Sequence, residues 1–319
     1  MSEPLPRRRL GADGPEVSVL GLGTNNFGFR IGLEESRAVV DAALDEGVTL
    51  FDTADVYGAG ESERLLGQLV RDRRDEVVLL TKFANPGMPD APEARRGSAE
   101  YHRWALDGSL GRLGVDVIDV WMYHRPDKET PMAETIGHMA EAIRAGKARY
   151  AAVSNVTVEQ LDEAAAAASA EGIPLVAVEN RYSVVTREAD ADVVPAAERH
   201  GVSLLPYYPL ECGLLTGRYR RGEPPPEESR FAGRPDIWPA ERWLDEAAFD
   251  RLDALEAVAQ RTGASVLELA IGGLAALPSV GSVIAGARTP EQVRANAAAA
   301  RYNPDEDTVA ALDSLPNAR

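Results

Sequence analysis

The stretch VTLFDTADVYG, residues 48–58, joins a short apolar run to a polar segment that contains Asp52 and Tyr57. The apolar part is rich in residues that favour β-strands. Residues 34–46 and 61–70, on either side, are rich in residues that favour helices. A strand between two helices is the repeating unit of a parallel α/β fold, so we expect Asp52 to lie where the strand ends and the loop begins.

The same alternation continues along the chain. Further strands are predicted at 17–23, 77–81, 117–123, 148–153, 175–178, 202–206 and 282–285, and further helices at 98–112, 132–145, 158–170, 190–200, 245–261, 266–277 and from 290. Eight strands with intervening helices within about 250 residues predict an α/β fold of the closed (β/α)8 TIM barrel type. An open doubly wound sheet is the alternative.

Three further features complete the predicted architecture. Turn residues at 11–15 (GADGP) predict an N-terminal β-hairpin before the first barrel strand. Residues 211–239 are too many for an ordinary connection, so we expect a long functional loop after the seventh strand, together with an extra helix. No change in composition marks a boundary, and residues 1–319 are predicted to form one domain.

The composition bounds the possible partners and the compartment. The chain has 34 basic and 51 acidic side chains, a net charge of −17, which argues against nucleic acid and anionic membranes as partners. The one cysteine, Cys212, excludes an intramolecular disulfide and is compatible with a reducing compartment. No apolar run is long enough to span a membrane. We therefore expect a cytoplasmic protein; the oligomeric state cannot be inferred from the pattern.

Three predicted strands end in an ionisable residue. Asp52 follows VTLF, Lys82 follows VVLLT and His124 follows VIDVWMY, while Tyr57 lies on the loop after Asp52. In a (β/α)8 barrel the carboxyl ends of the strands carry the chemistry. Any one of these residues alone is better interpreted as a strand cap or a solvated loop residue. Three strands that end this way favour a catalytic group instead.

These four residues can form a proton donor. Tyr57, with an ordinary pKa of about 10, is a poor acid at neutral pH unless a nearby cation stabilises the phenolate. Lys82 can supply that cation, Asp52 can keep Lys82 charged and oriented, and His124 can hydrogen-bond a carbonyl oxygen. None of the four acts as a covalent nucleophile in this arrangement.

At these positions the sequence resembles the aldo-keto reductase family. FDTADVYG (51–58), LLTKF (79–83) and WMYHRPD (121–127) occur in that order, and the resemblance extends over nearly the whole chain. It implies a (β/α)8 barrel that transfers a hydride from a nicotinamide to the carbonyl carbon of an aldehyde, ketone or open-chain sugar. It also implies that Tyr57 is the general acid, with supporting roles for Asp52, Lys82 and His124.

The segment GARTPEQ (286–292) predicts an anion site. Thr289 can cap a helix whose first residue is Pro290 and whose third, Gln292, completes a capping-box spacing. Helix N-termini bind anions, and Arg288 offers a guanidinium beside this one. A capped helix with a surface arginine is an equally good interpretation of the spacing alone. The resemblance implies adenosine and 2′-phosphate contacts, which favour NADPH over NADH, from Gly286, Arg288, Gln292 and Asn296.

The resemblance also implies contacts with the rest of the cofactor. Ser154 and Asn155 would hold the nicotinamide carboxamide, Tyr207 would stack on the ring, and residues 210–214 would pass along the pyrophosphate. Turn chemistry and core packing are the plain alternatives for the same residues. The full set expected to contact cofactor is Gly23, Thr24, Asn25, Asp52, Ser154, Asn155, Glu179, Tyr207, Pro209, Leu210, Gly213, Leu214, Gly286, Arg288, Gln292 and Asn296.

Three residues depart from the family pattern. Glu179 stands where the family often has Gln, Tyr208 replaces a common serine, and Ala285 replaces a common proline. An ionised carboxylate only accepts hydrogen bonds, whereas an amide also donates them. Either Glu179 is protonated or it holds the carboxamide through the NH2 group alone.

The substrate pocket is expected to be shaped by residues 83–97 and 211–239. Its candidate lining residues are Phe27, Tyr57, Phe83, Met88, His124, Arg125, Ile237 and Trp238. No metal is expected, because the histidines show no metal-ligand spacing. The sequence GLGTNNFG (21–28) lacks the third glycine of a dinucleotide-binding G-x-G-x-x-G motif.

Two other functions remain open at this point. The family includes NADPH-binding barrels that attach to membrane channels as regulatory subunits and turn over slowly. A lyase that uses Lys82 as a Schiff base is the second alternative. It is disfavoured because Asp52 would keep Lys82 protonated.

Overall fold

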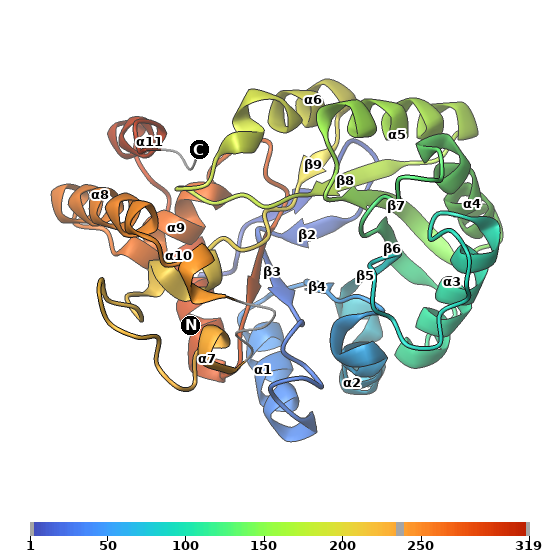
Figure 1. Ribbon diagram of the computed structural model, residues 1–319, viewed down its shortest axis with the longest axis horizontal. Helices are drawn as coiled ribbons and strands as arrows, with labels where there is room; N and C mark the ends of the chain where they lie inside the picture. Colours follow the sequence, from blue (N-terminus) through green and yellow to red (C-terminus); the bar gives the residue numbers. More distant parts are fainter. Residues whose placement is uncertain (1–2, 234–238, 317–319) are drawn as a thin grey trace.

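The computed structural model describes residues 3–233 and 239–316 and shows a curled sheet of eight parallel strands flanked by helices (Figure 1). In chain order the strands are β3 (Leu20–Gly23), β4 (Leu50–Asp52), β5 (Val78–Phe83), β6 (Ile118–Tyr123), β7 (Ala148–Ser154), β8 (Leu175–Glu179), β9 (Ser203–Leu204) and β10 (Val283–Gly286). The order in the sheet is β10-β3-β4-β5-β6-β7-β8-β9. Isolated parallel bridges between Leu204 and Val280 and between Tyr207 and Ile284 join the two edges. The predicted (β/α)8 barrel is confirmed.

Helices lie on the outer face of the sheet (Figure 1). They are α1 (Leu33–Asp45), α2 (Glu61–Val70), α3 (Ala99–Leu113), α4 (Met132–Arg144), α5 (Val158–Glu171), α6 (Val193–His200), α7 (Arg230–Gly233), α8 (Glu246–Thr262), α9 (Val266–Ala275), α10 (Pro290–Ala300) and α11 (Glu306–Asp313). Short 3-10 turns are η1 (Tyr57–Gly60), η2 (Arg71–Glu76), η3 (Glu188–Ala191), η4 (Glu211–Thr216) and η5 (Ala240–Arg242).

The predicted N-terminal hairpin is present and closes the amino end of the barrel. Strands β1 (Arg7–Arg9) and β2 (Glu16–Ser18) pair antiparallel. Leu10 and Val17 are fully buried in the cluster that fills the barrel interior, together with residues such as Leu80 and Met122. A second, larger cluster lies between the sheet and the helices. Because the hairpin covers one end of the barrel, the other end is left for a site.

The boundaries of several predicted elements are corrected. The strand expected at 17–23 is two strands, because Ser18 ends the hairpin and Leu20 begins the barrel strand. The strand expected at 202–206 contributes only Ser203 and Leu204 to the sheet. The helix expected at 190–200 begins at Val193, and α11 follows the helix that was expected to be the last. Within 211–239, η4 and α7 form short turns of helix.

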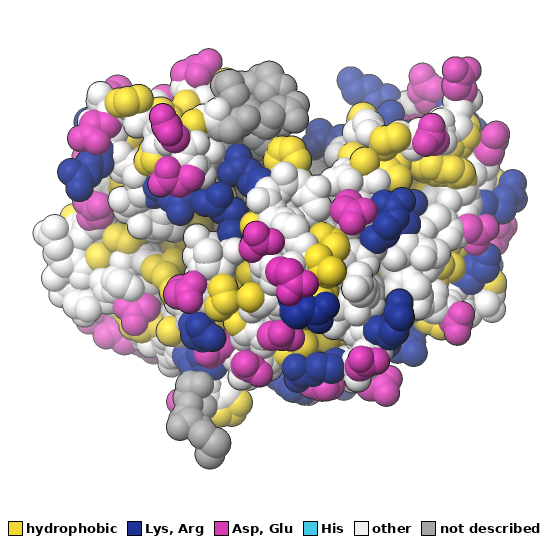
Figure 2. Space-filling view, turned by 90° about the horizontal axis from the view of Figure 1, so that it is seen from below, with side chains coloured by type: hydrophobic (Ala, Val, Ile, Leu, Met, Phe, Trp, Pro, Cys, Tyr) yellow, Lys and Arg dark blue, Asp and Glu magenta, His cyan; other side chains and the backbone are white. Residues whose placement is uncertain are grey.

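The described surface carries both signs of charge. On the face drawn in Figure 2, acidic and basic side chains are interspersed. Within residues 3–233 and 239–316, no helix combines the length and the apolar character needed to cross a membrane.

Candidate active site

Four strands of the barrel bring their carboxyl ends to one site. Asp52 ends β4, Lys82 lies one residue before the end of β5, His124 follows β6, and Glu179 ends β8. Tyr57 begins η1, on the loop after Asp52. The structure therefore brings together the four residues that the sequence indicated, and Glu179 joins them.

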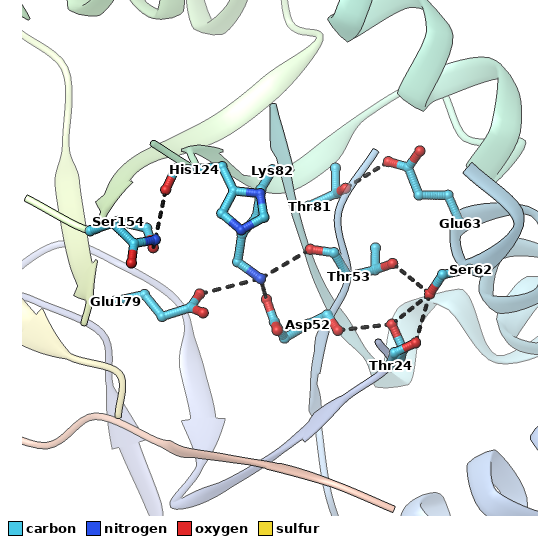
Figure 3. A network of polar contacts seen from close by, with 11 residues as sticks. Thr24, Asp52, Thr53, Ser62, Glu63, Thr81, Lys82, His124, Ser154 and Glu179 are labelled. Carbon is cyan, nitrogen blue, oxygen red and sulfur yellow. Dashed lines mark hydrogen bonds and ion pairs between the residues drawn. The ribbon is translucent and has the colours of Figure 1, made fainter. Parts of the chain in front are cut away.

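Lys82 is the centre of this group and is fully buried. Its ammonium donates hydrogen bonds to the carboxylate of Asp52 and to the carbonyl oxygen of Thr53, the latter at 3.1 Å. The Oε2 atom of Glu179 lies 3.4 Å from the same nitrogen (Figure 3). One ammonium thus faces two buried carboxyl groups.

This arrangement determines the protonation of the three groups. Burial alone would lower the pKa of Lys82, but the negative charge of Asp52 raises it above its ordinary value. Burial, opposed by Lys82, raises the pKa of Asp52. Burial and the charge of Asp52 raise the pKa of Glu179 to about 8. Lys82 therefore stays charged, and the raised pKa of Glu179 favours its protonated form more than that of an ordinary glutamate.

Tyr57 is held as a neutral phenol. The ammonium of Lys82 lies 5.2 Å from the centre of the Tyr57 ring and lowers the pKa of the phenol, but burial has the larger effect and raises it. Lys82 lowers the pKa of Tyr57, as expected, but burial raises that pKa by more. The resting residue is therefore a proton donor with its proton in place.

His124 lies beside Tyr57, with ring centres 5.9 Å apart in an edge-to-face arrangement. Burial, together with the charges of Lys82 and Arg125, lowers the pKa of His124 well below its ordinary value, so the imidazole is neutral. Within residues 3–233 and 239–316 its buried Nδ1 atom has no hydrogen-bond partner. The His124 residue also lines the cavity, so its neutral ring can offer a hydrogen bond to a ligand there.

A cavity of about 1000 Å³ opens above these residues. Asp52, Tyr57, His124 and Glu179 line one part of it, and the first turn of α10 lines another. Ligand pockets commonly measure about 300 to 1000 Å³, so this one is large enough for an extended ligand and a small second molecule.

Asn155 connects two parts of the cavity wall. Its side-chain amide donates to the carbonyl oxygen of His124 and to Ser154 Oγ, each at 2.9 Å. Its Oδ1 accepts a hydrogen bond of 2.7 Å from the hydroxyl of Tyr207. The backbone of Asn155 has a φ of 55°, a conformation that asparagine tolerates better than most residues. These bonds fix the orientation of the Tyr207 ring, which lines the cavity.

The N-terminus of α10 faces the same cavity. Thr289 caps the helix by accepting a hydrogen bond from the amide of Gln292 at 3.4 Å, as expected. The side chain of Gln292 accepts instead from the amide of Arg288 at 2.8 Å, so the predicted capping box does not close on Thr289. Gly286, Arg288, Gln292 and Asn296 all line the cavity. An anion here would meet the N-terminus of a helix and a guanidinium.

Comparison with known proteins identifies the family. Residues 19–317 match the model of the aldo/keto reductase family. The chain belongs to the aldo/keto reductase family. The predicted resemblance is thus confirmed.

Several curated aldo/keto reductase relatives cover most of the chain. An L-glyceraldehyde 3-phosphate reductase of Escherichia coli K12 is 33% identical over 297 residues, which cover 91% of this chain and 86% of the relative. A probable voltage-gated potassium channel subunit beta of Arabidopsis thaliana is also 33% identical, over 91% of this chain and 89% of its own. A protein with the same description from Oryza sativa subsp. japonica is 35% identical, with the same coverage.

Most residues expected to contact cofactor line the cavity of this aldo/keto reductase. They are Gly23, Asn25, Asp52, Asn155, Glu179, Tyr207, Pro209, Leu210, Gly213, Gly286, Arg288, Gln292 and Asn296. Three others lie behind its wall. Thr24 donates to the carbonyl oxygen of Asp52 and bonds to Ser62 Oγ (Figure 3), Ser154 is buried beside Asn155, and Leu214 belongs to the apolar core.

The expected substrate pocket needs larger corrections. Tyr57, His124 and Arg125 line the cavity, but Phe27 and Phe83 are fully buried in the core and do not. Phe83 stacks on Trp121 with ring centres 4.7 Å apart, on the side of β5 that faces the helices. Met88 is also not among the lining residues. Ile237 and Trp238 lie outside the described residues.

Several residues of the cavity wall were not predicted from the sequence. Phe29 and Arg30, on the loop after β3, Asn85, after β5, and Arg218, after η4, all line the cavity. They lie on irregular segments, so no strand or helix periodicity could have found them. In the described part of the chain, no group of three or more His, Cys, Asp or Glu side chains is suited to hold a metal ion.

Proposed function

We propose that this protein is an NADPH-dependent reductase that converts an aldehyde, ketone or open-chain sugar to the corresponding alcohol. The observation that carries the proposal is the set of Tyr57, Lys82, Asp52 and His124 at one end of a cavity whose other wall includes the N-terminus of α10. Membership of the aldo/keto reductase family supports it.

The residues present fit a nicotinamide dinucleotide. Asn155, Tyr207 and Glu179 offer polar and aromatic contacts at the end near Tyr57, and Arg288 with the α10 N-terminus offers an anion site at the other. The guanidinium of Arg288 is the basis for proposing NADPH, with its 2′-phosphate, over NADH. When bound, the reduced cofactor supplies a hydride to the carbonyl carbon.

The protein's own residues supply the proton and the binding surface. Tyr57 donates its phenolic proton to the carbonyl oxygen as negative charge develops there. Lys82, held charged by Asp52, stabilises the phenolate that remains. His124, which is neutral and lines the cavity, orients the carbonyl oxygen by a hydrogen bond. A cytoplasmic location belongs to the same proposal and rests on the single cysteine.

The proposal is tested by NADPH consumption with a panel of aldehydes, ketones and sugars, including a triose phosphate, for the wild type and Tyr57→Phe. We expect turnover that falls at least about a hundredfold in Tyr57→Phe, because the proton donor is lost. NADPH affinity, measured by fluorescence titration, should stay within a few-fold. Turnover that does not depend on Tyr57 would overturn the assignment.

A second candidate function is that of an NADPH-binding regulatory barrel with little turnover. The observation that favours it is the 33% and 35% identity to two proteins described as probable channel beta subunits. Tight NADPH binding without turnover of any carbonyl compound in the panel would support this function over the reductase.

A further inference from the structure

Glu179 has no role in the proposed proton donation, because Tyr57 supplies the proton and Asp52 already keeps Lys82 charged. Glu179 ends β8, its side chain is 4% exposed, and it lines the cavity. Its Oε2 atom forms an ion pair of 3.4 Å with the ammonium of Lys82 (Figure 3), and within the described residues this atom has no closer hydrogen-bond partner. A buried carboxyl group therefore lines the cavity, and its Oε2 atom lies against the ammonium of Lys82.

The charges around Glu179 do not balance if it is ionised. Lys82 contributes one positive charge, and Asp52 already takes the closer contact with it. Arg181, two residues along the chain, pairs with Glu211 at 2.5 Å. The remaining titratable or charged groups of the neighbouring elements are Tyr57 on η1, His124 and Arg125 after β6, and Tyr207 after β9.

None of those groups provides a second fixed positive charge in contact with Glu179. Tyr57 and His124 are neutral, burial raises the pKa of Tyr207, and Arg125 is exposed. Because Asp52 holds the lysine more closely, we assign the proton of the carboxyl pair to Glu179. The group then consists of one ammonium, one carboxylate and one neutral acid, and its charges balance.

A cation placed in this cavity would change the balance. The nicotinamide ring is positively charged in NADP+ and neutral in NADPH, and the rest of the two molecules is the same. We propose that Glu179 is the counter-charge of the oxidised cofactor: it loses its proton to solvent when NADP+ binds and keeps it when NADPH binds. The carboxyl O–H bond breaks, its electron pair stays on the carboxylate, and no other bond changes.

This role is specific to a carboxyl group at position 179. A glutamine would make comparable hydrogen bonds but could not ionise. The inference rests on the proposed nicotinamide site, since it needs the ring to lie in the part of the cavity that Glu179, Asn155 and Tyr207 line. It goes further by making NADP+ binding, and not NADPH binding, dependent on pH.

The direct test is calorimetric titration of each cofactor at pH 7 in two buffers with different ionisation enthalpies, which counts the protons exchanged. With a pKa of about 8, about nine-tenths of Glu179 is protonated at pH 7. We expect close to one proton released per NADP+ and none per NADPH. By linkage, NADP+ affinity should rise about tenfold from pH 7 to pH 9, while NADPH affinity stays constant.

Two variants locate the group that releases the proton. Glu179→Gln should bind both cofactors without proton release and without the pH dependence. Asp119→Asn, which removes a buried carboxyl at the opposite end of the barrel, should behave as the wild type. The comparison of NADP+ with NADPH on the wild type needs no variant, so it decides the matter even if a variant folds poorly.

The outcomes separate this inference from the proposed function. If both cofactors bind and the proton counts are equal, the role of Glu179 is overturned and the reductase proposal stands. Proton release that persists in Glu179→Gln also overturns it, because another group would be responsible. If neither cofactor binds, the nicotinamide site itself is wrong and both proposals fail together.

Discussion

The two ends of the barrel bury charge in opposite arrangements. At the carboxyl end, one ammonium, Lys82, lies between the carboxyl groups of Asp52 and Glu179, and none of the three side chains is more than 4% exposed. At the amino end, one carboxylate, Asp119, lies between the guanidinium groups of Arg74 and Arg149, at 2.7 and 2.8 Å. These arginines are 24% and 58% exposed, so they keep part of their hydration.

The difference separates a site built for chemistry from one built for stability. Where every partner is dehydrated, charges shift protonation states, as the raised pKa of Glu179 shows. Where the cations reach solvent, the pair mainly joins segments: Asp119 also accepts the amide of Leu79 at 2.9 Å and so connects β5, β6 and β7. In barrels of this kind, the carboxyl end carries catalysis and the amino end carries stability. Three substitutions, from the largest effect to the smallest, test this distinction.

Replacing Lys82 by Met should have the largest effect. Two buried carboxyl groups would lose their cation, which typically costs about 3 to 5 kcal/mol when they are ionised. When a carboxyl group has a higher pKa in the folded than in the unfolded protein, the free energy of unfolding falls as the pH rises from the unfolded pKa to the folded pKa. We therefore expect a larger loss at pH 8 than at pH 5, measured by denaturant unfolding followed through tryptophan fluorescence.

Turnover of Lys82→Met should also fall at least about a hundredfold, because the phenolate of Tyr57 loses its stabilising charge. The double variant Lys82→Met with Glu179→Gln is the matched control, since it removes one of the two unpaired acids. It should recover part of the stability at pH 8 but none of the turnover. A loss of stability equal at the two pH values would contradict the assignment of buried, titrating carboxyl groups.

Asp119→Ala should lower the free energy of unfolding by less than Lys82→Met does. It removes the partner of two arginines and the acceptor of the Leu79 amide, and because the arginines reach solvent we expect a loss of about 2 to 3 kcal/mol. Turnover of the folded variant should equal that of the wild type. If the variant is fully folded and its turnover is nevertheless reduced, the amino end also contributes to catalysis, and the two ends do not have separate roles.

The sequence predicted the barrel and the four central residues because both are local patterns. Apolar runs alternate with helix-forming segments, and Asp52, Lys82 and His124 directly follow or end such runs. The alternation of side chains along a strand could have corrected one error. Lys82 points into the barrel with Leu80, so Phe83, next along β5, must point to the helices. Its assignment to the substrate pocket ignored that period.

The remaining cavity residues could not be predicted in this way. Phe29, Arg30, Asn85 and Arg218 are placed by loop conformation, which depends on contacts between distant segments. The contact between Arg30 and the carbonyl oxygen of Ser229 is an example, since 199 residues separate the two. Glu179 was recognised in the sequence as a departure from the family, but its pairing with Lys82 depends on the closing of the barrel. Formation of one domain by residues 1–319 stays a prediction.

The smallest effect is expected at Thr157, which lies two residues after Asn155 in the sequence and does not line the cavity. Thr157 caps α5: its hydroxyl accepts from the amide of Gln160 at 3.3 Å, and the Gln160 side chain accepts from the amide of Thr157 at 3.0 Å. Thr157→Ala should cost about 1 kcal/mol, as loss of a helix cap commonly does. Denaturant midpoints measure this loss, and Thr157→Ser, which keeps the hydroxyl, should restore most of it.

Turnover and cofactor affinity should be unchanged in Thr157→Ala, because Thr157 does not line the cavity. Asn155, two residues earlier, reaches the cavity through bonds to His124 and Tyr207 that do not involve the cap. A tenfold loss of turnover at full stability would mean that the α5 cap positions Asn155. Contact with the cavity would then not be enough to separate catalytic from structural residues at the carboxyl end of a strand.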